Sequence, residues 1–224
     1  MSDFQQRLQV ELPAPSQLFT PGVIGSLVLL IVGYAVMCYA PNFVVANLAL
    51  STQGVFSGKV WQLLTYPFME PFVLNVIFGL WVIIFAGSAV ERQWGTRGYL
   101  LLWLVVTVVC GLVWLLVSMA LEQPWVGGGI SVACYGLIGA FGLLYRHARF
   151  FMWICTIEGQ WLALIMIGIG LVLCIPAPVT VVWVGGALVA YVYVQIRWRL
   201  QSGPKLRQPR AQKAGGGGGF VDID

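Results

Sequence analysis

Ser131 is the residue of this chain best suited to nucleophilic chemistry, and His147 is its single histidine. Ser131 follows three glycines, Gly127 to Gly129, and opens an apolar stretch rich in small residues. A buried serine hydroxyl is a weak nucleophile unless a base within about 3 Å accepts its proton. The distance between Ser131 and His147 therefore decides whether this serine can react.

No base for Ser131 is predicted. We expect His147 to lie sixteen residues further along the same helix, a separation of about 24 Å at a rise of 1.5 Å per residue. Lys59 falls in a different loop, and nothing in the sequence places it beside the serine. Tyr135 is one turn away, but a pKa near 10 makes tyrosine a poor base at neutral pH.

The glycine turn before Ser131 suits an anion. Backbone N–H groups of Gly129 and Ile130 at a helix N-terminus are typical of an oxyanion site. The structural alternative is that Ser131 is merely the N-cap of a helix after this turn. The five cysteines lack metal-ligand or disulfide spacing, so we expect no metal site and no cofactor.

The composition is that of an integral membrane protein. Hydrophobic residues make up 59% of the chain and charged residues only 9%, with a mean hydropathy of +0.88. A soluble domain has roughly 25% charged residues. The net charge of +4 is no sign of nucleic-acid binding. We expect the lipid bilayer as the surroundings, in a plasma membrane such as the bacterial inner membrane.

The fold class predicted is an all-α membrane protein with six transmembrane helices. Each apolar run approaches the roughly 20 residues that cross a bilayer as a helix. The predicted spans are 22–40, 72–90, 99–121, 128–145, 160–175 and 178–196, the fifth with an alternative start near Phe151. Eleven of the twelve basic residues fall on one side and only Lys59 on the other, which predicts cytoplasmic N- and C-termini.

Three parts of the chain follow from this topology. Residues 1–21 form a cytoplasmic N-terminal segment, 22–197 the membrane domain, and 198–224 a disordered, basic and glycine-rich cytoplasmic tail. The connection 41–71 is too apolar for a solvated loop and too interrupted for a span. We expect short helices there, with Trp61 and Tyr66 at headgroup depth.

Four motifs, in the right order on six spans, resemble the rhomboid family of intramembrane serine proteases. Residues 87–95, with Gly87, Glu91 and Gly95, match its GxxxExxxG pattern. Residues 129–141 are similar to its nucleophile segment, and 61–68 to its WRLLTxxF stretch, with Gln62 where arginine is usual. Small residues around Gly186 resemble the face behind its catalytic histidine.

Small residues also have a physical meaning here. Gly136 lies on a nearly bare face of the fourth predicted span, and Gly186 lies on a similar face of the sixth. Bare faces allow helix backbones to approach closely in lipid. Glu91 is interpreted as a structural residue that binds backbone N–H groups or an arginine at a helix end.

The resemblance implies a catalytic histidine where this chain has Trp183. It also implies a histidine and an asparagine that help to hold the oxyanion, and here those positions carry Asn75 and Gly79. Asn75 can still donate a hydrogen bond from its amide, whereas Gly79 cannot. Val132 replaces the usual glycine after the serine and crowds an approaching carbonyl group. Trp183 is expected to fill the space where a substrate strand enters.

The first hypothesis is therefore a pseudoprotease that binds transmembrane segments of other membrane proteins without cleaving them. The alternative is an active intramembrane serine protease in which Ser131 uses an unidentified base. A channel or transporter is the remote third possibility, because the spans carry almost no ionisable residues of the kind that mark ion paths.

Overall fold

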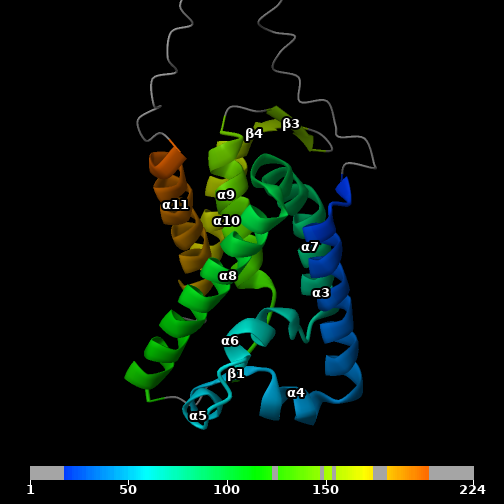
Figure 1. The fold of residues 1–224 in the computed structure, drawn as a ribbon, viewed down its shortest axis with the longest axis vertical. Coiled ribbons are helices and arrows are strands. Elements are labelled where there is room, and N and C mark those ends of the chain that lie inside the picture. The colour runs from blue at the N-terminus through cyan, green and yellow to red at the C-terminus, as the bar shows by residue number, and fades with distance from the viewer. Residues whose placement is uncertain (1–17, 123–125, 147–148, 153–154, 174–180, 202–224) are drawn as a thin grey trace, which may run out of the picture.

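Long helices packed side by side dominate the fold (Figure 1). The computed structural model describes residues 18–122, 126–146, 149–152, 155–173 and 181–201. The long helices are α3 (Pro21–Tyr39), α7 (Val73–Val82), α8 (Ser88–Ala120), α9 (Ser131–Leu144), α10 (Gly159–Leu173) and α11 (Val181–Gln201). A π-helical turn, η2 (Ile83–Gly87), joins α7 to α8.

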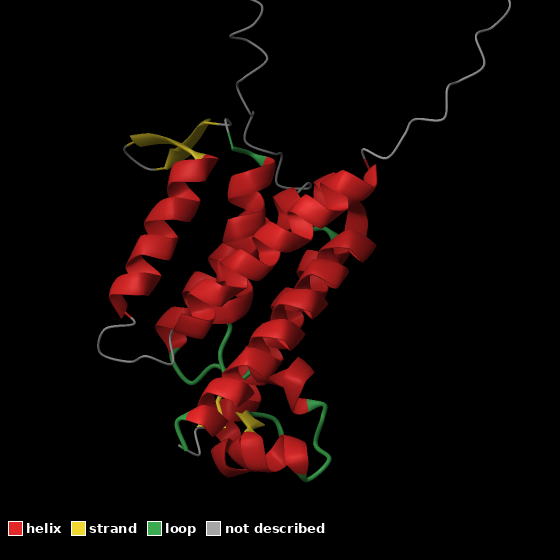
Figure 2. Cartoon of the chain, turned by 90° about the vertical axis from the view of Figure 1, so that its left-hand side faces the viewer, coloured by secondary structure: helices red, strands yellow, loops and turns green. Residues whose placement is uncertain are grey.

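Short helices fill the connection between α3 and α7 and gather at one end of the bundle (Figure 2). They are α4 (Pro41–Asn47), α5 (Thr52–Phe56), α6 (Gln62–Thr65) and the 3-10 turn η1 (Tyr66–Phe68). Short helices in this segment are as the sequence predicts. Tyr66 is buried within the protein, with its side chain 5% exposed, and its hydroxyl donates to the carbonyl oxygen of Thr107 at 2.9 Å. The headgroup depth predicted for Trp61 and Tyr66 stays a prediction.

Two small antiparallel sheets were not predicted for an all-α fold. β1 (Leu50–Ser51) pairs with β2 (Val126–Gly127), which places Gly127 opposite Leu50 and ties the glycine turn to the short helices. β3 (Arg149–Met152) pairs with β4 (Cys155–Glu158). Because Phe151 lies in this second sheet, the alternative start of the fifth span near Phe151 is wrong.

Several predicted boundaries also move. The fourth span was predicted from 128, but α9 begins at Ser131 because the preceding glycine turn, with Gly129 at φ +127°, is not helical. Helix α9 ends at Leu144, so Ser131 and His147 do not share one helix as predicted, and His147 lies outside the described residues. Helix α11 continues to Gln201, past the predicted start of the tail at 198.

Two helical stretches among the described residues are long and apolar enough to cross a membrane by length and composition. They are 21–39 and 73–120, which contain 18-residue windows with a mean hydropathy of 2.2 and 2.9. The second stretch is interrupted at Gly95, whose φ of 73° and ψ of 168° are not helical. Figure 1 accordingly shows α7 and the later part of α8 as separate rods. The full set of six spans and their orientation stay predictions.

Glu91 ties α3 to α8 and explains the GxxxExxxG pattern. Its carboxylate accepts hydrogen bonds from the backbone N–H groups of Gly22 and Val23, both at 2.9 Å, and from the hydroxyls of Thr20 and Thr96. An anion is stabilised at a helix N-terminus, which here is the start of α3. The structural role predicted for Glu91, binding to backbone N–H groups at a helix end, is confirmed.

The two glycines of the pattern have separate tasks. A methyl group at Gly87 would lie 3.3 Å from the ring of Tyr99, so the small residue lets that buried ring pack closely. Gly95 has open space around it, but its positive φ is a backbone conformation that favours glycine. In this pattern, Gly87 allows close packing, Glu91 caps the start of α3, and Gly95 interrupts the helix.

Candidate functional site

Ser131 is the first residue of α9 and is half-buried. The N-cap is Ile130, which has helical backbone angles and makes no side-chain capping bond. The prediction that Ser131 is the N-cap is therefore wrong. Among the residues that the structure describes, no side chain forms a hydrogen bond with the Ser131 hydroxyl.

Close contact between α9 and α11 fixes the frame around Ser131. A methyl group at Gly186 would lie 2.5 Å from the carbonyl oxygen of Val132, so only glycine permits this approach. Gly136 plays the same part toward α8, since a methyl group there would lie 2.7 Å from Cγ1 of Val106. The structure thus brings Gly136 and Gly186 to helix contacts, in the manner expected of small residues in membrane proteins.

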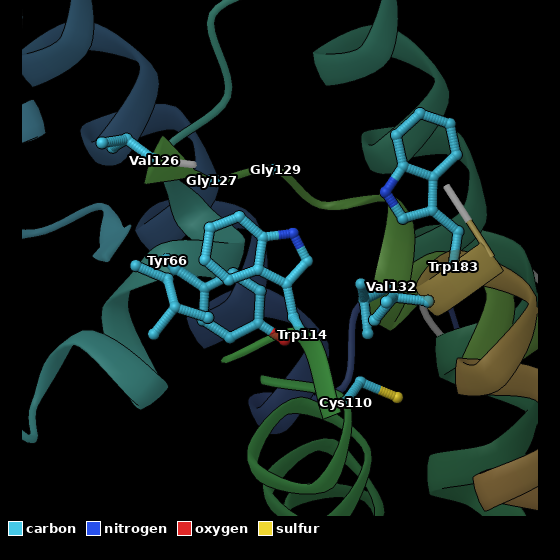
Figure 3. Close-up of a pocket in the computed structure, with 11 residues that line it drawn as sticks. Tyr66, Cys110, Trp114, Val126, Gly127, Gly129, Val132 and Trp183 are labelled. Atoms are coloured by element: carbon cyan, nitrogen blue, oxygen red, sulfur yellow. The ribbon is translucent and has the colours of Figure 1, made fainter. Parts of the chain in front are cut away.

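A cavity of about 340 Å³ lies beside the glycine turn. Its walls come from the short helices, α8, the turn itself and α11. The lining residues that matter here are Trp114, Gly129, Val132 and Trp183. Figure 3 shows the indoles of Trp114 and Trp183 on two sides of this space, next to the turn. Ser131 is not among the described residues that line it.

Trp183, the residue at the position of the expected histidine, is half-buried and packs against the hydrophobic core. It lines the cavity next to Val132 and does not point away from it. An indole N–H is a hydrogen-bond donor only and accepts no proton from a serine. The side chain at the position where the resemblance implies a histidine therefore offers no proton acceptor.

Three of the four residues predicted for the oxyanion region converge on one side chain, Glu70. Its Oε2 accepts a hydrogen bond from the backbone N–H of Ile130 at 3.2 Å, and its Oε1 accepts one from Nδ2 of Asn75 at 3.1 Å. A methyl group at Gly129 would lie 2.7 Å from Oε2. Glu70 is 2% exposed.

Gly79, the fourth of these residues, leaves a space that Ile130 fills. A methyl group at Gly79 would lie 2.9 Å from Cγ2 of Ile130 and 3.2 Å from Cδ2 of Leu30. A side chain that could donate a hydrogen bond has no room there. The donor that the resemblance implies at this position is thus replaced by hydrophobic packing.

Sequence reasoning missed Glu70. The available signal was an acidic residue in the apolar connection 41–71, five residues before Asn75. Burial raises the pKa of Glu70, and the hydrogen bonds from Asn75, Phe72 and Ile130 lower it again in part.

No group of three or more His, Cys, Asp or Glu residues able to hold a metal ion occurs within the described part of the chain.

Comparison with known protein families finds a match for this chain. The family model described as Rhomboid domain matches residues 57–200, a range that includes Glu70, Glu91, Ser131 and Trp183. No curated protein matches the chain.

Proposed function

Because this chain belongs to the rhomboid family of integral membrane proteins, we propose that it is a pseudoprotease that binds transmembrane segments of other membrane proteins without cleaving them. We place it in a plasma membrane, such as the bacterial inner membrane. In this proposal the chain keeps the helical scaffold of the family but lacks the catalytic base.

The single observation that carries the proposal is the position of Trp183. It lines the cavity beside Val132 and offers no proton acceptor where the family has its histidine. A serine without its base forfeits several orders of magnitude in rate. The proposal is supported by the lack of a hydrogen bond from any described side chain to the Ser131 hydroxyl.

The cavity supports the binding half of the proposal. Its volume of about 340 Å³ lies at the lower end of the roughly 300–1,000 Å³ common for binding sites. Leu50, Trp114, Val132 and Trp183 give it an apolar and aromatic lining. Such a lining favours an apolar side chain, which is what a transmembrane segment presents.

The test uses the full chain in liposomes with a transmembrane substrate that contains helix-breaking residues and a fluorophosphonate probe for active serines. We expect no cleavage and no labelling, but photocrosslinking to the transmembrane segment. Labelling that disappears in Ser131→Ala contradicts the proposal and establishes an active protease.

Trp183→Ala is expected to weaken the crosslink because it removes one wall of the cavity. The matched control is Trp161→Ala, since Trp161 is 55% exposed on α10 and is not a lining residue. Equal losses in both variants contradict binding at this cavity.

A further inference from the structure

Glu70 lies in the short connection between η1 and α7, pressed against the start of α9. It is 2% exposed, which is unusual for a glutamate outside an ion pair. An ionised carboxylate has acceptors only, so it is stable in such a place only where N–H or O–H groups point at it. The burial of Glu70 therefore requires hydrogen-bond donors around its carboxylate.

Three donors converge on the carboxylate from two segments far apart in the sequence. The backbone N–H of Phe72 and Nδ2 of Asn75 reach Oε1 at 3.3 and 3.1 Å. The backbone N–H of Ile130, 60 residues further along the chain than Glu70, reaches Oε2 at 3.2 Å. These are donors of the kind that stabilise an oxyanion next to a serine.

The carboxylate also lies where the helix favours negative charge. The first backbone N–H groups of a helix have no partner within the helix, and the N-terminus carries a partial positive charge. Helix α9, with 14 residues, begins directly after Ile130. Gly129, with φ +127°, lets the turn pass so close to Glu70 that a methyl group there would lie 2.7 Å from Oε2.

We propose that the carboxylate of Glu70 is a built-in ligand of the oxyanion region, which engages Asn75 and the Ile130 N–H and closes the region to the carbonyl oxygen of a bound segment. A substrate oxygen reaches these donors only if the carboxylate leaves. The inference deepens the proposed function and rests on it, since it names a second reason why a segment bound here is not cleaved.

Chemical rescue tests the proposal in the full-length protein in detergent. Glu70→Ala leaves a carboxylate-sized space facing three donors, and its melting temperature should fall below that of the wild type. Sodium formate, compared with sodium chloride at equal ionic strength, should refill that space. We expect formate to raise the melting temperature of Glu70→Ala by about 2–4 °C, the shift that 1 kcal/mol gives in a protein of this size.

The wild type and Glu122→Ala serve as controls, because Glu122 is an exposed carboxylate with no hydrogen bond to Asn75 or Ile130. Formate should leave both unchanged. The proposal is overturned if formate does not stabilise Glu70→Ala, or if it stabilises the wild type equally.

Should Glu70→Ala fail to fold, Glu70→Gln keeps the size of the side chain and turns an NH₂ group toward one set of donors. The amide keeps one acceptor oxygen, so one of the two backbone N–H groups, that of Ile130 or that of Phe72, loses its acceptor. Amide hydrogen exchange at one of these two residues should then be at least about tenfold faster than in the wild type and in Glu122→Gln. Equal exchange rates overturn the proposal. Labelling of Ser131 in the wild type is a separate measurement. It would contradict the pseudoprotease proposal, whereas the formate experiment tests the role of Glu70.

Discussion

Two buried glutamates each cap the start of a helix in this protein, one at the start of α3 and the other at the glycine turn before α9. Glu91 is 3% exposed and binds two N–H groups of α3, whereas Glu70 is 2% exposed and binds one N–H group before α9. The donors around Glu91 join α3 to α8. Those around Glu70 include Asn75 and Ile130, which the resemblance assigns to an oxyanion region. In our proposal, the same carboxylate chemistry stabilises the scaffold at one site and occupies a functional region at the other.

The largest effect should come from Glu91→Ala. Two backbone N–H groups and two threonine hydroxyls lose their acceptor, and each buried unsatisfied donor costs about 1–3 kcal/mol. Part of this is recovered by water and by rearrangement, so we expect a loss of about 3–5 kcal/mol in the free energy of unfolding, measured by denaturant titration in mixed micelles. Glu122→Ala is the control, and a loss of less than 1 kcal/mol for Glu91→Ala would contradict the role of Glu91 as a cap.

The two glycines with positive φ beside these glutamates form the next comparison. Gly95→Ala introduces backbone strain of about 1–3 kcal/mol but meets no neighbouring atom. Gly129→Ala adds to such strain a methyl group 2.7 Å from Oε2 of Glu70. We therefore expect Gly129→Ala to cost about 1 kcal/mol more than Gly95→Ala in the same titration. The reverse order would mean that Glu70 moves aside freely and does not hold the turn.

The difference between the two glutamates also explains what the sequence could predict. Glu91 belongs to a spaced motif at the end of a long apolar run, so its structural role follows from residues 87–95 alone. The role of Glu70 depends on how the short helices fold back toward α9, because its partner Ile130 lies 60 residues away. The places of Asn75, Gly79 and Trp183 in the family's pattern come from counting along the chain from the motifs, and they stay predictions. The filling of the Gly79 space by Ile130 was not predictable, because side-chain packing between α7 and the turn leaves no trace in local spacing.

A smaller effect is a pH dependence carried by Glu70. Burial raises the pKa of this carboxyl in the folded protein above the value of about 4.3 for a free glutamate. The folded state therefore binds the proton more tightly than the unfolded state. The resulting stabilisation is fully present below about pH 4.3 and is lost as the pH rises through the folded-state pKa.

Comparison with Glu70→Gln isolates this contribution. The free energy of unfolding of the wild type, minus that of Glu70→Gln, should decrease from acidic toward neutral pH. Glu122→Gln provides the baseline for other titrating groups. A difference that increases with pH would mean that the three hydrogen bonds outweigh burial and hold the pKa of Glu70 below its value in the unfolded chain.

The smallest expected effect is that of Trp183→His, which places a histidine where the resemblance implies the catalytic base. We expect no labelling of Ser131 by a fluorophosphonate probe in this variant. The reason is that Asn75 and the Ile130 N–H are still engaged by Glu70, and an oxyanion-site donor is worth about 10²–10³ in rate. Val132, which we expect to crowd a carbonyl group approaching the serine, is also unchanged in this variant and lines the cavity.

Combining Trp183→His with Glu70→Ala separates the two causes of inactivity that we propose, with Ser131→Ala added as the control for specific labelling. Labelling in the double variant alone would show that the base and the open oxyanion region are both required. Labelling in Trp183→His alone would show that Glu70 does not close the site, and it would reduce Glu70 to a second scaffold cap like Glu91. The functional difference between Glu70 and Glu91 is therefore tested by Trp183→His, which supplies a histidine but is expected to give no labelling of Ser131 while Glu70 is present.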